Sequence, residues 1–129
     1  MKSILVFLEN ILNTNAIIFF LPIKTRSLNL PDIKLPKDHK FWHTGIIYKN
    51  KIYETFNHGK YSISKFNKKE LNIQEAEYTE YKIDINKLYS ELNSGTSCGT
   101  YVARVVGVCN SKGSIKTYYP DDIYNIIKR

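Results

Sequence analysis

The segment at residues 41–56, FWHTGIIYKNKIYETF, constrains the possible folds of this chain more than any other stretch. It contains two runs rich in isoleucine, tyrosine, threonine and phenylalanine, which are residue types that favour β-strands. Between the runs lies Lys49-Asn50-Lys51, a polar candidate for a tight turn. Two strands joined in this way pair antiparallel, so the sequence predicts a β-hairpin here.

Periodic apolar positions and short β-branched runs predict the elements around this hairpin. Turn residues, prolines and candidate N-caps such as Asp84 mark their ends. The expected elements are a helix over 3–12, a break at 13–15, a buried strand over 16–23 ended by Pro22, a long loop over 24–40, extended segments over 61–66 and 78–83, a short helix over 84–92, a helix over 98–108, and a last helix that begins at 119–122.

The length of 129 residues fits one domain, which we expect to span residues 1–129. With 43% hydrophobic and 24% charged residues, the composition is that of a folded globular protein and too apolar for a disordered chain. The net charge of +7 favours anionic partners such as cell-wall polymers. The lysines are dispersed, however, and the densest run, at 65–69, carries only three, so specific nucleic-acid binding is not expected.

Segment 1–24 is apolar, but Glu9 and the polar residues 13–15 divide it into two short runs. Neither run approaches the roughly 20 residues needed to span a bilayer, and no small-residue cleavage site follows the first run. Two cysteines are too few for a disulfide framework. We therefore expect no membrane span and a cytoplasmic location in the producing or host cell, with association with virions as an open alternative.

Cys98 is the candidate nucleophile. It follows the loop Gly95-Thr96-Ser97 and precedes an apolar helical run, which places it at the start of a helix. Unpaired N–H groups and the helix dipole at that end favour the thiolate and lower the pKa of the thiol. The same N–H groups can stabilise an oxyanion on an attacked carbonyl. The alternative is a small buried hydrophobic residue, which is the commonest role of a free cysteine.

Cys109 lies near the end of the same predicted helix. Eleven residues of helix separate it from Cys98 by roughly 16 Å, which is too far for a disulfide. We expect Cys109 to be structural. No metal or other cofactor is expected, because the three histidines are dispersed and the two cysteines are far apart.

His43 is the best candidate for the base that activates the thiol. It begins the first strand of the predicted hairpin, and Gly45 two residues later leaves space beside it. His39 lies in the proline-rich loop and resembles a surface residue, while His58 follows the hairpin in a turn-like sequence. A structural role for a lone histidine is the alternative.

Glu54 becomes a candidate third member through the geometry of the hairpin. Side chains alternate along a strand, and cross-strand neighbours share a face. If the turn contains an even number of residues, positions 43, 45 and 47 share a face with positions 52, 54 and 56. A carboxylate at 54 can then accept the second ring N–H of His43 and fix its tautomer. A three-residue loop would reverse the parity, and a solvent-facing glutamate is the equally weighted alternative.

A histidine on a hairpin, an acidic residue on its second strand, and a later cysteine at a helix start form an order that resembles a known family. It is similar to the circularly permuted branch of the NlpC-like, papain-fold cysteine peptidases. Three segments carry the resemblance: HTGIIYKNKIYETF at 43–56, TSCGTYVARVVG at 96–107, and YYPDDIYNII at 118–127. The last is similar to a tail found in many phage and viral members.

The resemblance covers roughly residues 41–127 and implies an α+β fold, with an antiparallel sheet or half-barrel packed on the helix that carries Cys98. It also implies thiol-dependent hydrolysis of an amide or ester, with Cys98, His43 and Glu54 as the catalytic residues. The thiolate would attack the carbonyl, and water would release the thioacyl enzyme.

The sequence departs from related patterns in two places. Lecithin retinol acyltransferase-like enzymes carry Asn-Cys-Glu-His-Phe at the nucleophile and a His-Trp pair at the base, whereas here Cys98 is followed by Gly-Thr-Tyr and Trp42 precedes the histidine. This difference argues against acyl transfer between lipids. No glutamine precedes Cys98, so backbone N–H groups must supply the oxyanion hole. The candidates for oxyanion or substrate contacts are Thr96, Ser97, Gly99 and Trp42.

Three classes of function are compatible with these residues. The first is a peptidase or amidase, with a peptide or peptidoglycan as its substrate. The second is a lipid-directed thiol hydrolase or acyltransferase, if the apolar loop over 28–42 opens a groove for an acyl chain. The third is a non-catalytic binding or virion protein that retains the fold.

Overall fold

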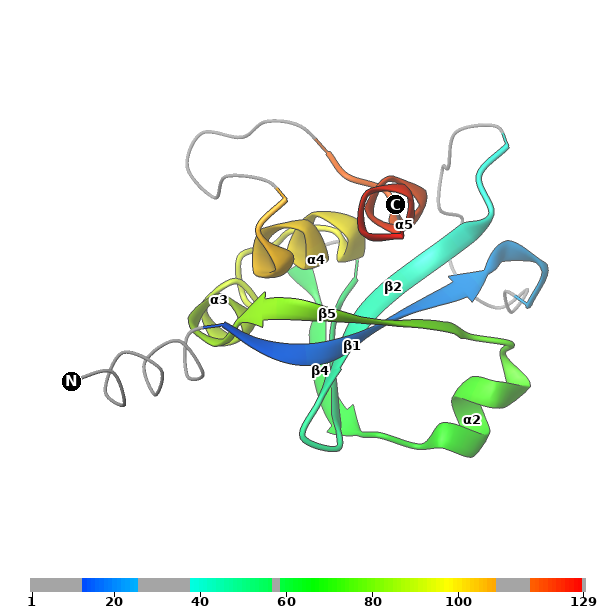
Figure 1. The fold of residues 1–129 in the computed structure, drawn as a ribbon, viewed down its shortest axis with the longest axis horizontal. Coiled ribbons are helices and arrows are strands. Elements are labelled where there is room, and N and C mark those ends of the chain that lie inside the picture. The colour runs from blue at the N-terminus through cyan, green and yellow to red at the C-terminus, as the bar shows by residue number, and fades with distance from the viewer. Residues whose placement is uncertain (1–12, 26–37, 57–58, 109–116, 129) are drawn as a thin grey trace.

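The computed structural model describes residues 13–25, 38–56, 59–108 and 117–128 of the chain. It is a mixed α+β structure with a five-stranded antiparallel sheet and several helices (Figure 1). The elements are β1 (Asn13–Pro22), the 3₁₀ helix η1 (Ile23–Thr25), β2 (Phe41–Tyr48), β3 (Lys51–Thr55), β4 (Tyr61–Lys65), α2 (Lys68–Ile73), β5 (Glu77–Asp84), α3 (Ile85–Ser90), α4 (Cys98–Val106) and α5 (Pro120–Ile127).

The strand order in the sheet is β4-β3-β2-β1-β5. Strands β2, β3 and β4 follow one another as neighbours, while β1 lies between β2 and β5 and pairs antiparallel with both. A register shift occurs where Leu21 faces His43 and Pro22 faces Phe41, so Trp42 is an extra residue in β2. Such a β-bulge bends a strand and redirects its side chains, and here it lies directly before His43.

The two faces of the sheet carry separate apolar clusters. Helices α4 and α5 cover one face and α2 lies over the other (Figure 1). Alternation along β1 supplies both clusters: Ile18 and Phe20 point toward α4 and α5, whereas Phe19 and Leu21 point toward α2. The cluster under α4 and α5 also includes Ile46, Tyr53, Ile83, Leu88, Tyr101, Val102, Val105 and Ile123.

Most elements expected from the sequence are confirmed. The hairpin, the extended segments at 61–66 and 78–83, and the last helix are present. The expected helix over 84–92 is shorter, with Asp84 as the N-cap whose side chain accepts the Lys87 N–H. The helix that begins at Cys98 ends at Val106, because Gly107 adopts a left-handed conformation with φ 79° and caps it.

The structure differs from the expected elements in two places. The strand expected over 16–23 already begins at Asn13, because residues 13–15 pair with β5 and Asn15 donates to Glu80 Oε1 over 3.0 Å. Helix α2 was not expected, and its N-cap is Asn67. The predicted helix at 3–12, most of the predicted loop at 24–40, His58 and Cys109 lie outside the described residues. Within the described ranges, every helix is too short or too polar to cross a membrane.

Candidate active site

The turn of the β2–β3 hairpin has an even number of residues. Tyr48 faces Lys51, so the turn consists of Lys49 and Asn50, whose φ angles of 47° and 65° match the twist that two-residue hairpins favour. The side chains at 43 and 54 therefore lie on the same face, and they meet. His43 Nε2 and Glu54 Oε1 are 2.8 Å apart.

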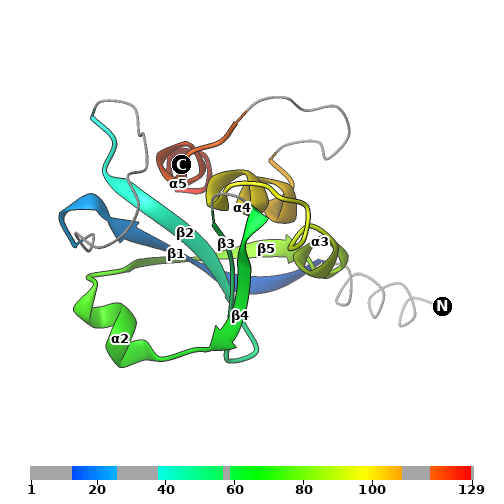
Figure 2. The same cartoon turned by 180° about the vertical axis from the view of Figure 1, so that it is seen from behind.

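Strands β2 and β3 pair only near this turn. Their ladder runs from Tyr48↔Lys51 to Ile46↔Tyr53, although both strands continue beyond it. The two strands diverge from the turn, and α4 lies over the open end (Figure 2). The Thr44 N–H can therefore bond to the sulfur of Cys98. This opening explains how the thiol of Cys98, on the face covered by α4 and α5, reaches the ring of His43, which packs with Phe19 on the α2 face.

Cys98 is the first residue of α4, directly after the N-cap Ser97. Its side chain is hydrogen bonded to the side chain of His43, and the N–H groups of Thr44 and Gly99 also bond to the sulfur. Because Glu54 binds Nε2 of the ring, Nδ1 is the nitrogen that remains for the thiol. The structure thus brings together the three residues that the sequence singled out.

The thiol and the imidazole change each other's protonation. Burial acts to lower the pKa of His43, but the hydrogen bonds and charges of Cys98 and Glu54 outweigh it and raise this pKa to about 10. Burial acts to raise the pKa of Cys98, but the hydrogen bond and charge of His43, with the N–H groups of Thr44 and Gly99, lower it below 9.0 overall. Both directions favour a thiolate–imidazolium pair at neutral pH.

Aromatic rings enclose the imidazole, which is only 3% exposed. Phe56 stacks parallel to it at 5.2 Å between ring centroids, and Trp42 lies at 5.2 Å with an angle of 30°. The indole N–H of Trp42 is buried and has no hydrogen-bond partner among the described residues. Phe56 was not singled out from the sequence, although its position on the face shared with 43 and 54 was a signal that could have identified it.

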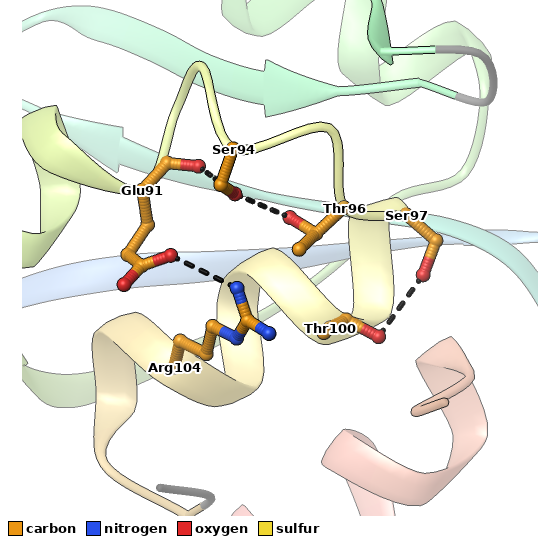
Figure 3. Close-up of polar contacts among 6 residues, drawn as sticks. All are labelled: Glu91, Ser94, Thr96, Ser97, Thr100 and Arg104. Carbon is orange, nitrogen blue, oxygen red and sulfur yellow. Dashed lines mark hydrogen bonds and ion pairs between the residues drawn. The ribbon is translucent and has the colours of Figure 1, made fainter. Parts of the chain in front are cut away.

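The remaining candidates surround the start of α4. Ser97 Oγ donates to Thr100 Oγ1 over 3.1 Å, and the hydroxyl oxygens of Thr96 and Ser94 are also 3.1 Å apart (Figure 3). The hydroxyl groups of the two candidates Thr96 and Ser97 therefore already have partners, in the loop and in the helix respectively. Gly99 contributes its backbone N–H to the sulfur. The first bond within the helix runs from Tyr101 N to Ser97 O, so the N–H groups before it have no acceptor in the helix itself.

An ion pair holds the loop before Cys98 against its own helix. Arg104 Nη1 and Glu91 Oε2 are 3.1 Å apart, and both side chains are largely buried (Figure 3). Ser94 Oγ also donates to the carbonyl oxygen of Glu91 over 2.6 Å, which tightens the turn after α3. The side chain and the backbone of Glu91 thus both hold the segment that leads to Cys98.

A cavity of about 310 Å³ borders the imidazole and its carboxylate partner. Its apolar walls include Leu21, Ile52 and Leu71 from the α2 side of the sheet. Cys98 is not among its described lining residues, so the cavity opens onto the Glu54 side of the histidine. In the described part of the chain, no three His, Cys, Asp or Glu side chains gather closely enough to bind a metal ion.

Comparisons with protein-family models, curated proteins and solved structures give no match for this chain. The chemical reading of the site therefore comes from its geometry. A thiol at a helix start, a buried imidazole beside it, and a carboxylate on the second ring nitrogen form an arrangement that can generate a reactive thiolate.

Proposed function

We propose that this protein is a cysteine hydrolase that cleaves amide bonds, with a permuted papain-like arrangement of its fold. The observation that carries the proposal is the continuous chain of contacts from the Cys98 thiol through the His43 ring to the Glu54 carboxylate. The order in the sequence supports the permuted arrangement, since the hairpin with the histidine precedes the helix with the cysteine.

In the proposed reaction, the Cys98 thiolate attacks the carbonyl carbon and forms a carbon–sulfur bond. The carbonyl oxygen takes up the negative charge next to the N–H groups of the first turn of α4, which have no acceptor within the helix. The carbon–nitrogen bond then breaks, and protonated His43 gives its proton to the leaving amine. Water attacks the thioester, His43 takes a proton from that water, and the carboxylic acid leaves as the thiolate re-forms.

Glu54 supports both proton transfers. Its carboxylate accepts the Nε2–H of His43 over 2.8 Å, which directs Nδ1 toward the sulfur and stabilises the imidazolium. The pair is almost fully buried, with the side chains 3% and 17% exposed, so water competes weakly for this hydrogen bond. A charge-assisted bond in such surroundings is roughly twice as strong as a neutral one.

Site-resolved alkylation tests the proposal. Iodoacetamide at pH 6 should modify Cys98 much faster than Cys109, as measured by mass spectrometry of peptides from the folded protein. Cys98→Ala should abolish hydrolysis of peptide amides and peptidoglycan fragments, whereas the matched variant Cys109→Ala should retain it, with unchanged circular dichroism in both. Equal alkylation of the two thiols, or turnover by Cys98→Ala, would overturn the proposal. Hydrolysis of phospholipid micelles but not of amides would reject the amide substrate.

A further inference from the structure

Residues 118–121, at the start of α5, contact the first turn of α4, the helix that carries Cys98. The Tyr118 N–H donates to Thr100 Oγ1 over 3.1 Å. Gly99 faces the same segment so closely that a Cβ atom there would lie 2.8 Å from the carbonyl carbon of Tyr118 and 2.9 Å from that of Tyr119. Real Cβ atoms do not approach carbonyl groups this closely. The first turn of α4 is therefore packed directly on segment 118–121.

The same segment also binds the start of β2, the strand that carries His43 and is called the histidine strand below. Asp121 Oδ2 accepts the Lys40 N–H over 2.8 Å, and Asp121 Oδ1 accepts the Phe41 N–H over 2.9 Å. A second contact is the edge-to-face packing of the Tyr119 and His39 rings, whose centroids are 5.4 Å apart. From sequence, the aspartates of this segment had only a role at the helix N-terminus. The structure shows that Asp121 reaches across to another element, two residues before the base.

We propose that segment 118–121 is a clamp that sets the position of the His43 strand relative to the Cys98 helix, and that Asp121 is its positioning residue. The contact with Gly99 fixes one side of the clamp and the Asp121 carboxylate fixes the other. The importance of the clamp for catalysis rests on the proposed function, but its effect on the thiol does not depend on any substrate.

The neighbouring aspartate provides a matched control. Asp122 Oδ2 accepts the N–H of Tyr119 over 2.8 Å, which caps its own helix, and among the described residues it makes no hydrogen bond or ion pair with β2. Both carboxylates belong to the first turn of α5, so their replacement by asparagine removes the same charge from the same helix end. Only Asp121→Asn also replaces an oxygen that binds the start of the histidine strand.

The test is the pH profile of Cys98 alkylation, measured with iodoacetamide and site-resolved mass spectrometry, together with thermal unfolding. An amide offers one acceptor oxygen, and its NH₂ group would face a backbone N–H, so one of the two anchoring hydrogen bonds is lost. We expect Asp121→Asn to lower the alkylation rate at pH 6 by roughly tenfold and to raise the apparent pKa of the thiol. Asp122→Asn should leave the alkylation profile unchanged, even if it lowers the melting temperature as much as Asp121→Asn does.

Identical profiles for the two variants would overturn the clamp while leaving the proposed function intact, provided the wild-type thiol is activated. An ordinary thiol in the wild type would instead refute the proposed function. If Asp121→Asn does not fold, Thr100→Val supplies the test from the other side of the clamp, because it removes the acceptor of the Tyr118 N–H. An unchanged thiol profile in Thr100→Val would then overturn the inference.

Discussion

Replacing Glu54 with glutamine would remove the negative charge behind the imidazole and keep an acceptor oxygen in nearly the same place. His43 Nε2 and Glu54 Oε1 are 2.8 Å apart and both side chains are largely buried. Glutamine has nearly the same shape as glutamate, so the substitution tests the charge and leaves the packing unchanged. A hydrogen bond to a charged group contributes about 1.5–3 kcal/mol and a neutral one about 0.5–1.5 kcal/mol. The expected loss for the imidazolium is therefore about 1–1.5 kcal/mol, or about one pH unit in the pKa of His43.

The variant should thus lower the pKa of His43 from about 10 toward 9. It should also reduce the fraction of thiolate–imidazolium pairs, relative to neutral pairs, by about tenfold. Nuclear magnetic resonance of the His43 ring measures the first change, and alkylation of Cys98 across pH measures the second. Under the proposed function, kcat/KM on an amide substrate should also fall by about tenfold.

Glu70→Gln is the matched control, because Glu70 lines the same cavity from α2 but is exposed to solvent. It should leave the pKa of His43 and the alkylation profile at their wild-type values. If the two glutamine variants gave the same pKa for His43, the charge of Glu54 would not stabilise the imidazolium, and the assignment of Glu54 would be refuted.

Three further measurements probe the same site. His43→Ala should raise the pKa of Cys98 above that of the wild type, because burial and the two backbone N–H groups then act alone; an unchanged alkylation profile would exclude the pairing. Gly99→Ala should lower the free energy of unfolding by about 1–3 kcal/mol in urea titrations, since its Cβ would lie 2.8 Å from the carbonyl carbon of Tyr118; wild-type stability would contradict the close packing. From the pH at which the folded thiol is ionised and the unfolded ring is neutral, up to pH 9.0, folding only moves a proton from the thiol to the ring, so the contribution of the pair to the free energy of unfolding should stay level. Above pH 9.0 the unfolded thiol loses its proton while the folded pair keeps one, so about 1.4 kcal/mol should be lost by pH 10 relative to Cys98→Ala.

The sequence predicted the local parts of the site well. The alternation of side chains and an even turn were enough to bring position 54 to the face of His43, because both depend only on strand geometry. The helix start at Cys98 was also predictable, since the loop before it and the apolar run after it are contiguous in sequence. These expectations required no knowledge of how the strands are ordered.

The remainder depends on contacts between distant segments. The insertion of β1 between β2 and β5 leaves no mark in the sequence of β1, so the apolar pattern places the start of the strand at 16 instead of Asn13. The early end of the β2–β3 ladder, which admits the thiol, lies where α4, a segment distant in sequence, packs on both strands. Asp121 likewise satisfies the expected pattern of an acidic helix start, and its bonds to Lys40 and Phe41 become visible only in three dimensions.

The register between β2 and β3 also limits where the length of this hairpin can vary in related chains. One residue added within β3, between the turn and position 54, would bring Thr55 to the side of the sheet that His43 occupies and would turn the carboxylate at 54 toward α4 and α5. A residue added to the turn itself would leave Tyr48 opposite Lys51 and keep the carboxylate on its present side, at the cost of a longer loop. In related chains that keep this pair of side chains, we therefore expect length changes in the turn and not within the strand.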